Sequence, residues 1–262
     1  MTRELEGKVA VVTGSTQGLG AAVAELLSRS GANVVLSGRS TENGERIRAR
    51  LGSRARFVRT DLASVSDCRA LIDAALREFD GIDILVNSAA DTSRSTVDSV
   101  TPEFFDRQIA INLRAPILLA HDAAEALRRR RGVIINIGSV NAAMGEPTLL
   151  VYSATKGALQ TASRNLAHAF KFDRVRVYCL NVGWMDTEGE RAVLAREGHP
   201  ADFIDRQGSR WPLGRPLRPS EVAEVCLFLA SDRAAPFSGT VIELEQFPTG
   251  VLAAPVREGP TS

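Results

Sequence analysis

A tyrosine and a lysine stand four positions apart in this 262-residue chain, at Tyr152 and Lys156. The chain holds only two tyrosines and three lysines, so this pairing is informative. Residues four apart share one face of a helix, so both side chains would meet the same reactant. A neighbouring ammonium stabilises a phenolate and lowers its pKa from about 10. The pair therefore predicts proton exchange with an alcohol or a carbonyl group.

Ser139 stands two positions after a largely apolar, β-branched run at residues 133–137, where a strand is expected. A hydroxyl at the carboxyl end of a parallel strand is well placed to donate a hydrogen bond to the reacting oxygen. A serine at such a position, taken alone, more often forms a turn or a helix cap. Together with Tyr152 and Lys156, however, Ser139 predicts general acid–base chemistry on a carbon–oxygen bond.

A glycine-rich loop follows the first predicted strand, residues 9–12, and precedes a predicted helix. Glycines permit a tight turn and a close approach of backbone N–H groups to a pyrophosphate, which the helix N-terminus also favours. The spacing is G-x-x-x-G-x-G and not the commoner G-x-G-x-x-G, but its place after a first strand predicts a dinucleotide site. The expected contacts in this loop are Gly14, Thr16, Gln17, Gly18, Leu19 and Gly20.

The end of the second predicted strand is where dinucleotide-binding folds read the ribose. Arg39 and Ser40 stand here, and no acidic residue does. A carboxylate would pair with the ribose hydroxyl of NAD and repel a 2′-phosphate, whereas Arg39 can hold that phosphate bidentately. NADP(H) is therefore preferred. NAD(H) stays open, because Gln17 adds no second positive charge.

Short apolar runs alternate with longer amphipathic stretches along the whole chain. Nearly continuous apolar strands separated by helices imply a parallel sheet covered on both faces. The expected fold class is therefore α/β, a single doubly wound domain over residues 1–262. Residues 184–215 break the alternation and are predicted to form a substrate lid near the carboxyl ends of the strands. Strands are expected at residues 9–12, 34–36, 57–58, 84–86, 133–137, 175–180 and 241–244.

Composition argues against several other classes of protein. The formal net charge is +1, so the chain lacks the overall basic charge typical of proteins that bind nucleic acid or anionic membranes. Its three cysteines and three histidines are scattered, so neither a disulfide framework nor a metal site is expected. No signal peptide and no run of membrane-spanning length is recognisable, which predicts a cytoplasmic protein.

These motifs together resemble the short-chain dehydrogenase/reductase family of Rossmann-fold, NAD(P)-dependent oxidoreductases, along nearly the whole chain. The resemblance rests on residues 13–20, on Ser139 and on the Tyr152-x-x-x-Lys156 pair. Asn112, in Ile-Asn-Leu, is similar to the family's fourth catalytic position, where an asparagine is thought to kink a helix. The resemblance implies hydride transfer between nicotinamide C4 and a substrate carbon. It also implies a homo-oligomer, commonly a tetramer.

The same resemblance extends the coenzyme site to the loops after later strands. Lys156 would hold the nicotinamide ribose, and Thr187 would bind the carboxamide. The chain departs from the family pattern at Ser88 and Ala90, at Val182 in place of a proline, and at residues 245–248 in place of Asp-Gly-Gly. The further coenzyme contacts that the resemblance implies are Asp61, Leu62, Asn87, Ser88, Ala89, Tyr152, Lys156, Gly183 and Thr187.

The substrate is defined less sharply by the sequence. Asn141, Glu146 and Trp184 are candidate contacts. A polar lining would suit a hydroxylated substrate such as a sugar, a sugar acid or a polyol, although polar side chains also face water on a plain surface. Two alternatives stay open: a 3-oxoacyl thioester reductase, and a coenzyme-binding regulator without catalysis. The polar residues of the predicted lid are Asp186, Glu188, Glu190 and Arg191.

Overall fold

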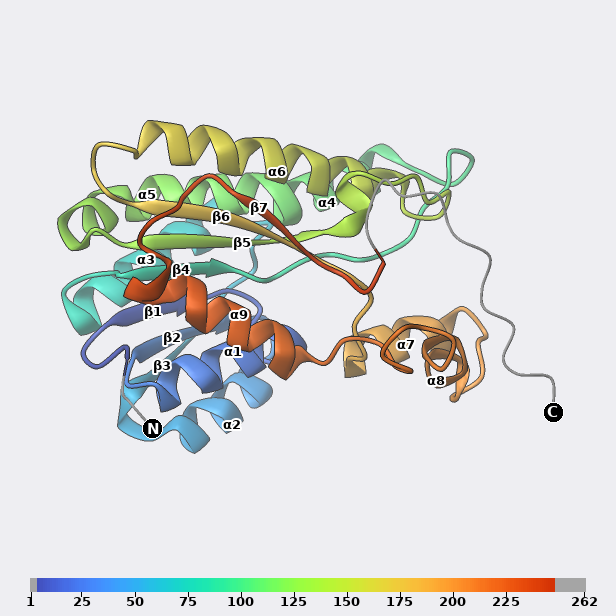
Figure 1. Cartoon of the computed structure of the whole chain (residues 1–262), viewed down its shortest axis with the longest axis horizontal. Coiled ribbons are helices and arrows are strands. Elements are labelled where there is room, and N and C mark those ends of the chain that lie inside the picture. Colours follow the sequence, from blue (N-terminus) through green and yellow to red (C-terminus); the bar gives the residue numbers. More distant parts are fainter. Residues whose placement is uncertain (1–3, 248–262) are drawn as a thin grey trace.

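A computed structural model of the chain describes residues 4–247, which form one seven-stranded parallel sheet between two layers of helices (Figure 1). The strand order is β3-β2-β1-β4-β5-β6-β7, so the direction of winding reverses between β1 and β4. Ligands of such sheets bind beyond the carboxyl ends of the strands at this reversal. The strands are β1 (Val9–Val12), β2 (Asn33–Gly38), β3 (Ala55–Arg59), β4 (Ile84–Asn87), β5 (Val133–Ser139), β6 (Arg176–Val182) and β7 (Val241–Leu244).

Each face of the sheet carries its own set of helices. One face is covered by α1 (Gly18–Arg29), α2 (Thr41–Leu51) and α9 (Pro219–Ala230). The other is covered by α3 (Val65–Phe79), α5 (Ala115–Arg130) and α6 (Leu150–Ala169). A π-helix, Ala110–Arg114, joins α4 (Pro102–Ile109) to α5. The described part of the chain also contains three 3₁₀ turns: Gly52–Arg54, Val140–Ala142 and Asp232–Ala234.

The apolar composition of the strands follows from their position between two hydrophobic cores. Successive side chains of a strand point to opposite faces of the sheet. Ala10 and Val12 of β1 accordingly pack in the core with α1, while Val11 between them packs in the core with α3 and α5. A strand that is buried on both faces has no polar alternation. The expected doubly wound α/β fold is confirmed.

Some strands run further than the apolar pattern indicated. The third was expected at residues 57–58, but it spans Ala55–Arg59 because its backbone pairs with β2 over five positions. Pairing of Gly138 with Asn181 and of Ser139 with Val182 likewise extends β5 and β6. Main-chain hydrogen bonds hold these residues in the ladder, whatever their side chains are.

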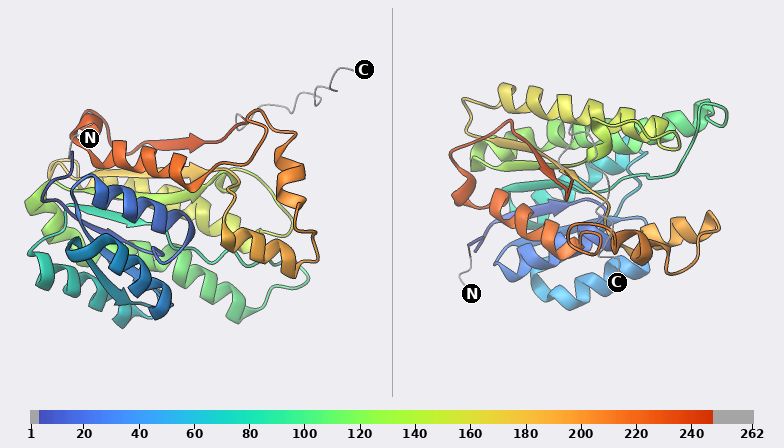
Figure 2. Two further views of the ribbon diagram at one scale, coloured as in Figure 1. Left: turned by 90° about the horizontal axis from the view of Figure 1, so that it is seen from below. Right: turned by 45° about the vertical axis from the view of Figure 1, so that its right-hand side comes forward.

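Residues 184–215 leave the layered part of the molecule and lie beyond the carboxyl ends of β5 and β6 (Figure 2). They contain α7 (Glu188–Arg196) and α8 (Phe203–Gly208). Backbone hydrogen bonds from Asp186 N to Leu217 O and from Leu217 N to Trp184 O, 3.0 and 3.1 Å long, tie the two ends of this segment together. Between residues 4 and 247, none of the helices has both the length and the apolar character needed to cross a membrane.

Candidate functional site

Ser139, Tyr152 and Lys156 come together at the carboxyl end of β5. Ser139 ends the strand, and Tyr152 and Lys156 lie in the first two turns of α6. The Ser139 hydroxyl is a hydrogen-bond partner of the Tyr152 phenol. The Lys156 ammonium lies over the Tyr152 ring, 5.6 Å from its centroid. The i,i+4 spacing thus places both side chains beside the serine, as the sequence predicted.

Burial governs the electrostatics of this group. Lys156 is only 2% exposed, and its Nζ donates a hydrogen bond to the Ile137 carbonyl at 2.8 Å. Desolvation lowers the pKa of Lys156 to about 8. Desolvation also raises the pKa of Tyr152 to about 12, against the smaller effect of its hydrogen bond with Ser139. We expected Lys156 to lower the tyrosine pKa. In this structure burial outweighs any such effect, because the ammonium donates to a carbonyl and not to the phenol.

Asn112 lies in the π-helix and connects the loop after β4 to the start of α6. Its Oδ1 accepts from Asp91 N at 2.7 Å, and its Nδ2 donates to Asp91 O at 2.9 Å and to Thr155 Oγ1 at 3.3 Å. Thr155 in turn donates to the Tyr152 carbonyl at 2.7 Å. π-Helices of a single turn are frequent at functional sites. The irregular helix expected around Asn112 is present, and the Asn112 side chain is linked to the Tyr152 carbonyl through the Thr155 hydroxyl.

The loop between β1 and α1 forms a cradle of backbone amides. Gly14 has φ +66°, and a Cβ on it would lie 2.8 Å from Ala89 Cα. A Cβ on Gly20 would lie 2.4 Å from the Gly14 carbonyl oxygen. Gln17 precedes α1 in extended conformation, and its side chain does not cap the helix. The first-turn N–H groups of α1 therefore lack a side-chain acceptor from the N-cap, as a site for an anion requires.

Two buried hydroxyls hold this cradle against its neighbours. Thr13 Oγ1 accepts hydrogen bonds from the backbone N–H groups of Ser88 and Ala89, at 3.0 and 3.2 Å. Ser15 Oγ donates to the Val12 carbonyl at 2.8 Å and accepts from Ser37 N at 2.9 Å. The ends of β1, β2 and β4 are thereby fixed relative to one another.

Replacing Thr13 by valine is expected to lower the free energy of unfolding by about 1–3 kcal/mol, because two amide groups lose their acceptor. Thr60→Val is the matched control. Thr60 is also buried, but within residues 4–247 its hydroxyl donates only to the Val58 carbonyl, at 3.0 Å. Denaturant unfolding of both variants measures the difference. An equal loss of stability in the two variants would contradict the role given to Thr13.

The adenine end of the predicted coenzyme site lies after β2 and β3. Arg39 is exposed and, among residues 4–247, forms no hydrogen bond or ion pair. Ser40 Oγ accepts from Asn43 N at 3.2 Å and so caps α2. Asp61 Oδ1 accepts from Ala63 N at 3.0 Å, and Leu62 is buried beside it. Arg39 is therefore the side chain of this group that is left free for a ligand.

The residues predicted for the nicotinamide end lie after β4 and between β6 and α7. Asn87 Nδ2 donates to Asn136 Oδ1 at 2.7 Å, while its buried Oδ1 has no partner in the described part of the chain. Such an oxygen calls for a donor. Thr187 Oγ1 caps α7 by accepting from Glu190 N at 3.0 Å. A Cβ on Gly18 would lie 3.8 Å from Thr187 Cγ2, so the start of residues 184–215 lies beside the glycine-rich loop.

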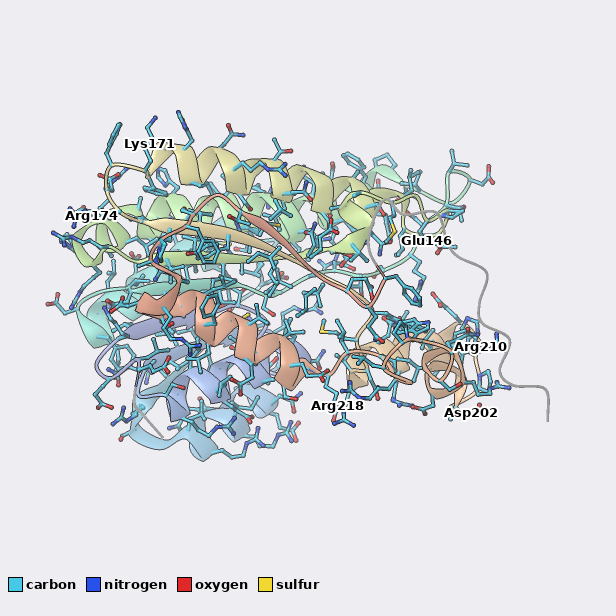
Figure 3. The ribbon with its side chains drawn as sticks, in the orientation of Figure 1. Glu146, Lys171, Arg174, Asp202, Arg210 and Arg218 are labelled. Atoms are coloured by element: carbon cyan, nitrogen blue, oxygen red, sulfur yellow. The ribbon has the colours of Figure 1, made fainter. Side chains whose placement is uncertain are left out.

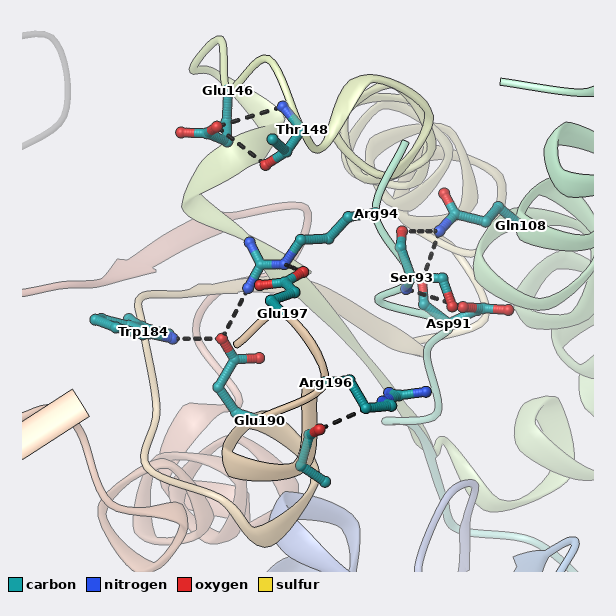
Figure 4. Close-up of polar contacts among 11 residues, drawn as sticks. Asp91, Ser93, Arg94, Gln108, Glu146, Thr148, Trp184, Glu190, Arg196 and Glu197 are labelled. Atoms are coloured by element: carbon teal, nitrogen blue, oxygen red, sulfur yellow. Dashed lines mark hydrogen bonds and ion pairs between the residues drawn. The ribbon is translucent and has the colours of Figure 1, made fainter. Parts of the chain in front are cut away.

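The three candidate substrate contacts differ in their surroundings. The Glu146 carboxylate is exposed and accepts from Thr148 N and Oγ1 within its own loop (Figures 3 and 4). Asn141 N donates to Ser139 Oγ at 3.2 Å. Trp184 Nε1 donates to Glu190 Oε1 at 2.8 Å (Figure 4). Asn141 and Trp184 thus connect to the residues around Tyr152, whereas Glu146 is engaged locally.

Sequence reasoning missed Arg94, which follows β4 and reaches across to the lid (Figure 4). Its Nη2 donates to Glu190 Oε1 at 3.2 Å, and its Nε lies 2.6 Å from Glu197 Oε1. The partners are about a hundred positions apart in the sequence, so no local spacing reveals them. The available signal was the position of Arg94, shortly after a strand that ends at the same edge as Ser139.

The departures from the family pattern at residues 245–247 are explained by contacts with the segment after β6. A Cβ on Gly183 would lie 2.0 Å from Glu245 Oε2, so Glu245 occupies that space. Gln246 Nε2 donates to the Arg215 carbonyl at 2.8 Å. The Phe247 ring packs on Trp211, with centroids 6.1 Å apart. Pro248 lies outside the described residues.

Other features of the molecule lie away from this site. In the part of the chain that the structure describes, no group of three or more His, Cys, Asp or Glu side chains is arranged to hold a metal ion. A cavity of about 630 Å³ lies at the amino end of β6, and its lining includes Arg131, Arg164, Lys171 and Arg174. Figure 3 places Lys171 and Arg174 at the end of the molecule opposite Asp202 and Arg210 of the lid.

Two curated relatives cover nearly the whole chain. It is 34% identical to the cis-4-hydroxycyclohexanecarboxylate dehydrogenase of Sinomonas cyclohexanicum, over 91% of this chain and 95% of that protein. It is 30% identical to the NADP-dependent (R)-specific alcohol dehydrogenase of Lentilactobacillus kefiri, over 89% of this chain and 93% of that protein. Both names describe oxidoreductases that act on a hydroxyl-bearing carbon.

Solved structures agree with the sequence comparison. A "short chain dehydrogenase/reductase family protein" superimposes with a TM-score of 0.80 at 33% identity, covering 92% of this chain and 96% of that one. The 3-ketoacyl-(acyl-carrier-protein) reductase from Brucella melitensis, complexed with NADH, gives a TM-score of 0.82 at 30% identity, over 92% and 97%. The family model described as enoyl-(acyl carrier protein) reductase matches residues 14–245. The chain therefore belongs to the short-chain dehydrogenase/reductase family of oxidoreductases, which bind NAD(P)(H) and act on CH–OH and C=O groups.

Proposed function

We propose that this chain interconverts a secondary alcohol and a ketone with NADP(H), and that its substrate is a sugar, a sugar acid or a polyol. The observation that carries the proposal is the convergence of Ser139, Tyr152 and Lys156 at the carboxyl end of β5. The polar groups of Glu190 and Trp184 beside them favour a hydroxylated substrate.

The proposed roles follow from the position of each group. Ser139 Oγ donates a hydrogen bond to the substrate oxygen, and Tyr152 exchanges the proton at that oxygen. A tyrosine with a pKa of about 12 is protonated at neutral pH, which is the form that donates a proton when a ketone is reduced. Asn112 positions the start of α6 through Thr155. The nicotinamide, when bound, supplies or accepts the hydride.

The residues around the cradle fit a dinucleotide. Gly14 and Gly20 allow the loop to pack tightly, because a Cβ on either would collide with the backbone of Ala89 or Gly14, and Asn87 Oδ1 offers a buried acceptor without a partner among the described residues. We assign the pyrophosphate to the amides at the start of α1. The ribose hydroxyls next to nicotinamide belong with Lys156, and the carboxamide with Thr187. The full set of proposed contacts is the one that the sequence predicted: residues 14, 16–20, 39, 40, 61, 62, 87–89, 152, 156, 183 and 187.

Arg39→Asp is expected to lower the preference for NADP over NAD by about 100-fold, because a bidentate phosphate contact is replaced by a repulsive charge. The measurement is kcat/KM for both coenzymes at saturating alcohol. Arg129→Asp, at the far end of α5, makes the same change in net charge as a control. If the wild-type enzyme has equal kcat/KM values for NADP and NAD, Arg39 does not bind the 2′-phosphate as proposed.

The test of the whole function is a screen of sugars, sugar acids, polyols and simple ketones with both coenzymes, followed by the absorbance of the reduced nicotinamide. A second candidate is a 3-oxoacyl thioester reductase, which the name of the Brucella melitensis structure favours. Activity on acetoacetyl-CoA without activity on any sugar or polyol would establish this candidate in place of the first.

We also propose that residues 184–215 act as the substrate lid and that the enzyme is a homotetramer. The lid proposal is supported by the contacts of Trp184 and Glu190 beside Tyr152, and the tetramer by family resemblance alone. A cytoplasmic location is proposed because Cys68, Cys179 and Cys226 are buried free thiols, as expected in a reducing compartment. Size-exclusion chromatography with light scattering tests the tetramer.

A further inference from the structure

Glu190 is the point where three segments of the chain meet (Figure 4). Its Oε1 accepts from Trp184 Nε1, just after β6, and from Arg94 Nη2, after β4. Arg94 also pairs with Glu197, just after α7. The side chains of Arg94, Glu190 and Glu197 are 26, 17 and 32% exposed, so they are largely shielded from solvent. We call these three residues the Arg94 cluster.

The Arg94 cluster has an excess of negative charge. One guanidinium faces two carboxylates, which leaves a formal charge of −1. Arg191, which belongs to the lid, is engaged in the same way, with Asp186 at 2.7 Å and Asp205 at 3.0 Å. Both arginines are therefore committed to pairs of carboxylates. Neither is free to bind an anionic group on a substrate.

One oxygen of Glu190 remains available. Trp184 and Arg94 both donate to Oε1, whereas Oε2 accepts no hydrogen bond from residues 4–247 and is not a buried atom. Ser95, the residue after Arg94, pairs with Leu149, and its N–H donates to the Thr148 carbonyl at 2.9 Å, so the Arg94 cluster lies beside the segment that leads into Tyr152. The Glu190 charge raises the pKa of the Tyr152 phenol. A hydroxyl next to the reacting carbon is therefore within the field of this carboxylate, which accepts hydrogen bonds and repels anions.

We propose that the Arg94 cluster selects neutral substrates: Glu190 Oε2 accepts a hydrogen bond from a hydroxyl near the reacting carbon, and the net negative charge excludes carboxylates and phosphates. The inference rests on the proposed function and narrows its range of substrates. Polyols and neutral sugars remain candidate substrates, whereas sugar acids and acyl-CoA thioesters are excluded. The relative from Sinomonas cyclohexanicum is named for a carboxylate substrate. This chain is expected to differ from that relative in selectivity.

The test compares Glu190→Gln with the wild-type protein on sorbitol and gluconate, a polyol and a sugar acid of the same carbon number. Glutamine keeps an oxygen for Trp184 and Arg94 but removes the charge. The ratio of kcat/KM for sorbitol to that for gluconate is expected to fall by about 10- to 100-fold, because the repulsion between like charges in a shielded site is lost. Arg94→Gln is expected to raise this ratio, because it leaves two carboxylates unpaired.

Glu188→Gln is the matched control, since Glu188 lies on the same helix, is exposed and has no partner among the described residues. For Glu188→Gln, the ratio of kcat/KM for sorbitol to that for gluconate is expected to stay within about twofold of the wild-type ratio, because exposed charges are strongly screened. Binding is measured separately by intrinsic fluorescence, since Trp184 and Trp211 are the only tryptophans of the chain. Wild-type fluorescence should respond to sorbitol and not to gluconate.

The two hypotheses fail in different ways. If the wild-type protein oxidises no sugar or polyol, but its fluorescence still selects sorbitol over gluconate and Glu190→Gln removes that selection, the proposed function fails and the charge selection stands. If the wild-type protein turns over or binds gluconate as well as sorbitol, the charge selection is wrong. An equal change of the ratio in Glu188→Gln and Glu190→Gln would overturn it as well.

Discussion

Tyr152→Phe is expected to lower the kcat for coenzyme-linked alcohol turnover by about 1,000-fold, because the proton at the substrate oxygen then has no side chain to move to or from. The ring and its packing are kept, so the free energy of unfolding should change little. Coenzyme binding, measured by quenching of tryptophan fluorescence, should persist. The measurement is the initial rate of change of nicotinamide absorbance with the best alcohol from the screen.

Tyr178→Phe provides a matched control, because it removes the same hydroxyl from the other tyrosine of the chain. Tyr178 is fully buried, and its hydroxyl donates to the Ala234 and Phe237 carbonyls at 2.9 and 2.6 Å. Its loss should cost stability and leave kcat near the wild-type value. Unchanged turnover of every alcohol by Tyr152→Phe would disprove the assigned chemistry.

Lys156→Met is expected to remove most of the activity and yet raise the free energy of unfolding at pH 7 by about 1–2 kcal/mol. Burial lowers the pKa of Lys156 to about 8, so holding it charged at pH 7 costs about 3 kcal/mol. Methionine has a similar volume and no charge. The hydrogen bond to the Ile137 carbonyl is lost at the same time, which offsets about 1–2 kcal/mol of the gain.

The pH dependence gives this prediction a second test. Folding lowers the Lys156 pKa from 10.5 to about 8, so between these values the unfolded chain binds more protons than the folded one. The free energy of unfolding of the wild type should therefore rise relative to Lys156→Met as pH increases from about 8 to 10.5. Lys171→Met, at an exposed lysine, is the control. A Lys156→Met variant that is less stable at pH 7 and has the same pH profile as wild type would refute the account.

The layers of the fold could be predicted because the apolar runs in the sequence match strands that are buried between two layers of helices. Runs such as 84–86 and 133–137 are apolar on both faces, and each lies between two helical cores. The site could be predicted only where its spacing is local or its position at a strand end is informative. Tyr152 and Lys156 meet because they share α6, and Ser139 meets them because β5 ends there.

Two kinds of information could not be obtained from the sequence. The first is contact between distant segments: Arg94 and Glu190 are 96 positions apart, and only the folded loops bring them together. The second is the balance of opposing electrostatic effects. The spacing of Lys156 and Tyr152 suggested that the ammonium lowers the tyrosine pKa. The sequence does not show how deeply the phenol is buried, and desolvation proves to be the larger effect.

The π-helix at Ala110–Arg114 makes this part of the chain sensitive to the insertion or deletion of a residue. Residues 102–130 are helical throughout, and each residue in a helix turns the chain by about 100°. Deleting one residue from the π-helix would restore regular α-helical winding and rotate Asn112 away from Asp91 and Thr155. An insertion or deletion that surface loops tolerate would therefore be damaging here. The number of residues in the helical stretch 102–130 is therefore constrained by the need to direct Asn112 toward α6, as well as by the core that this stretch covers.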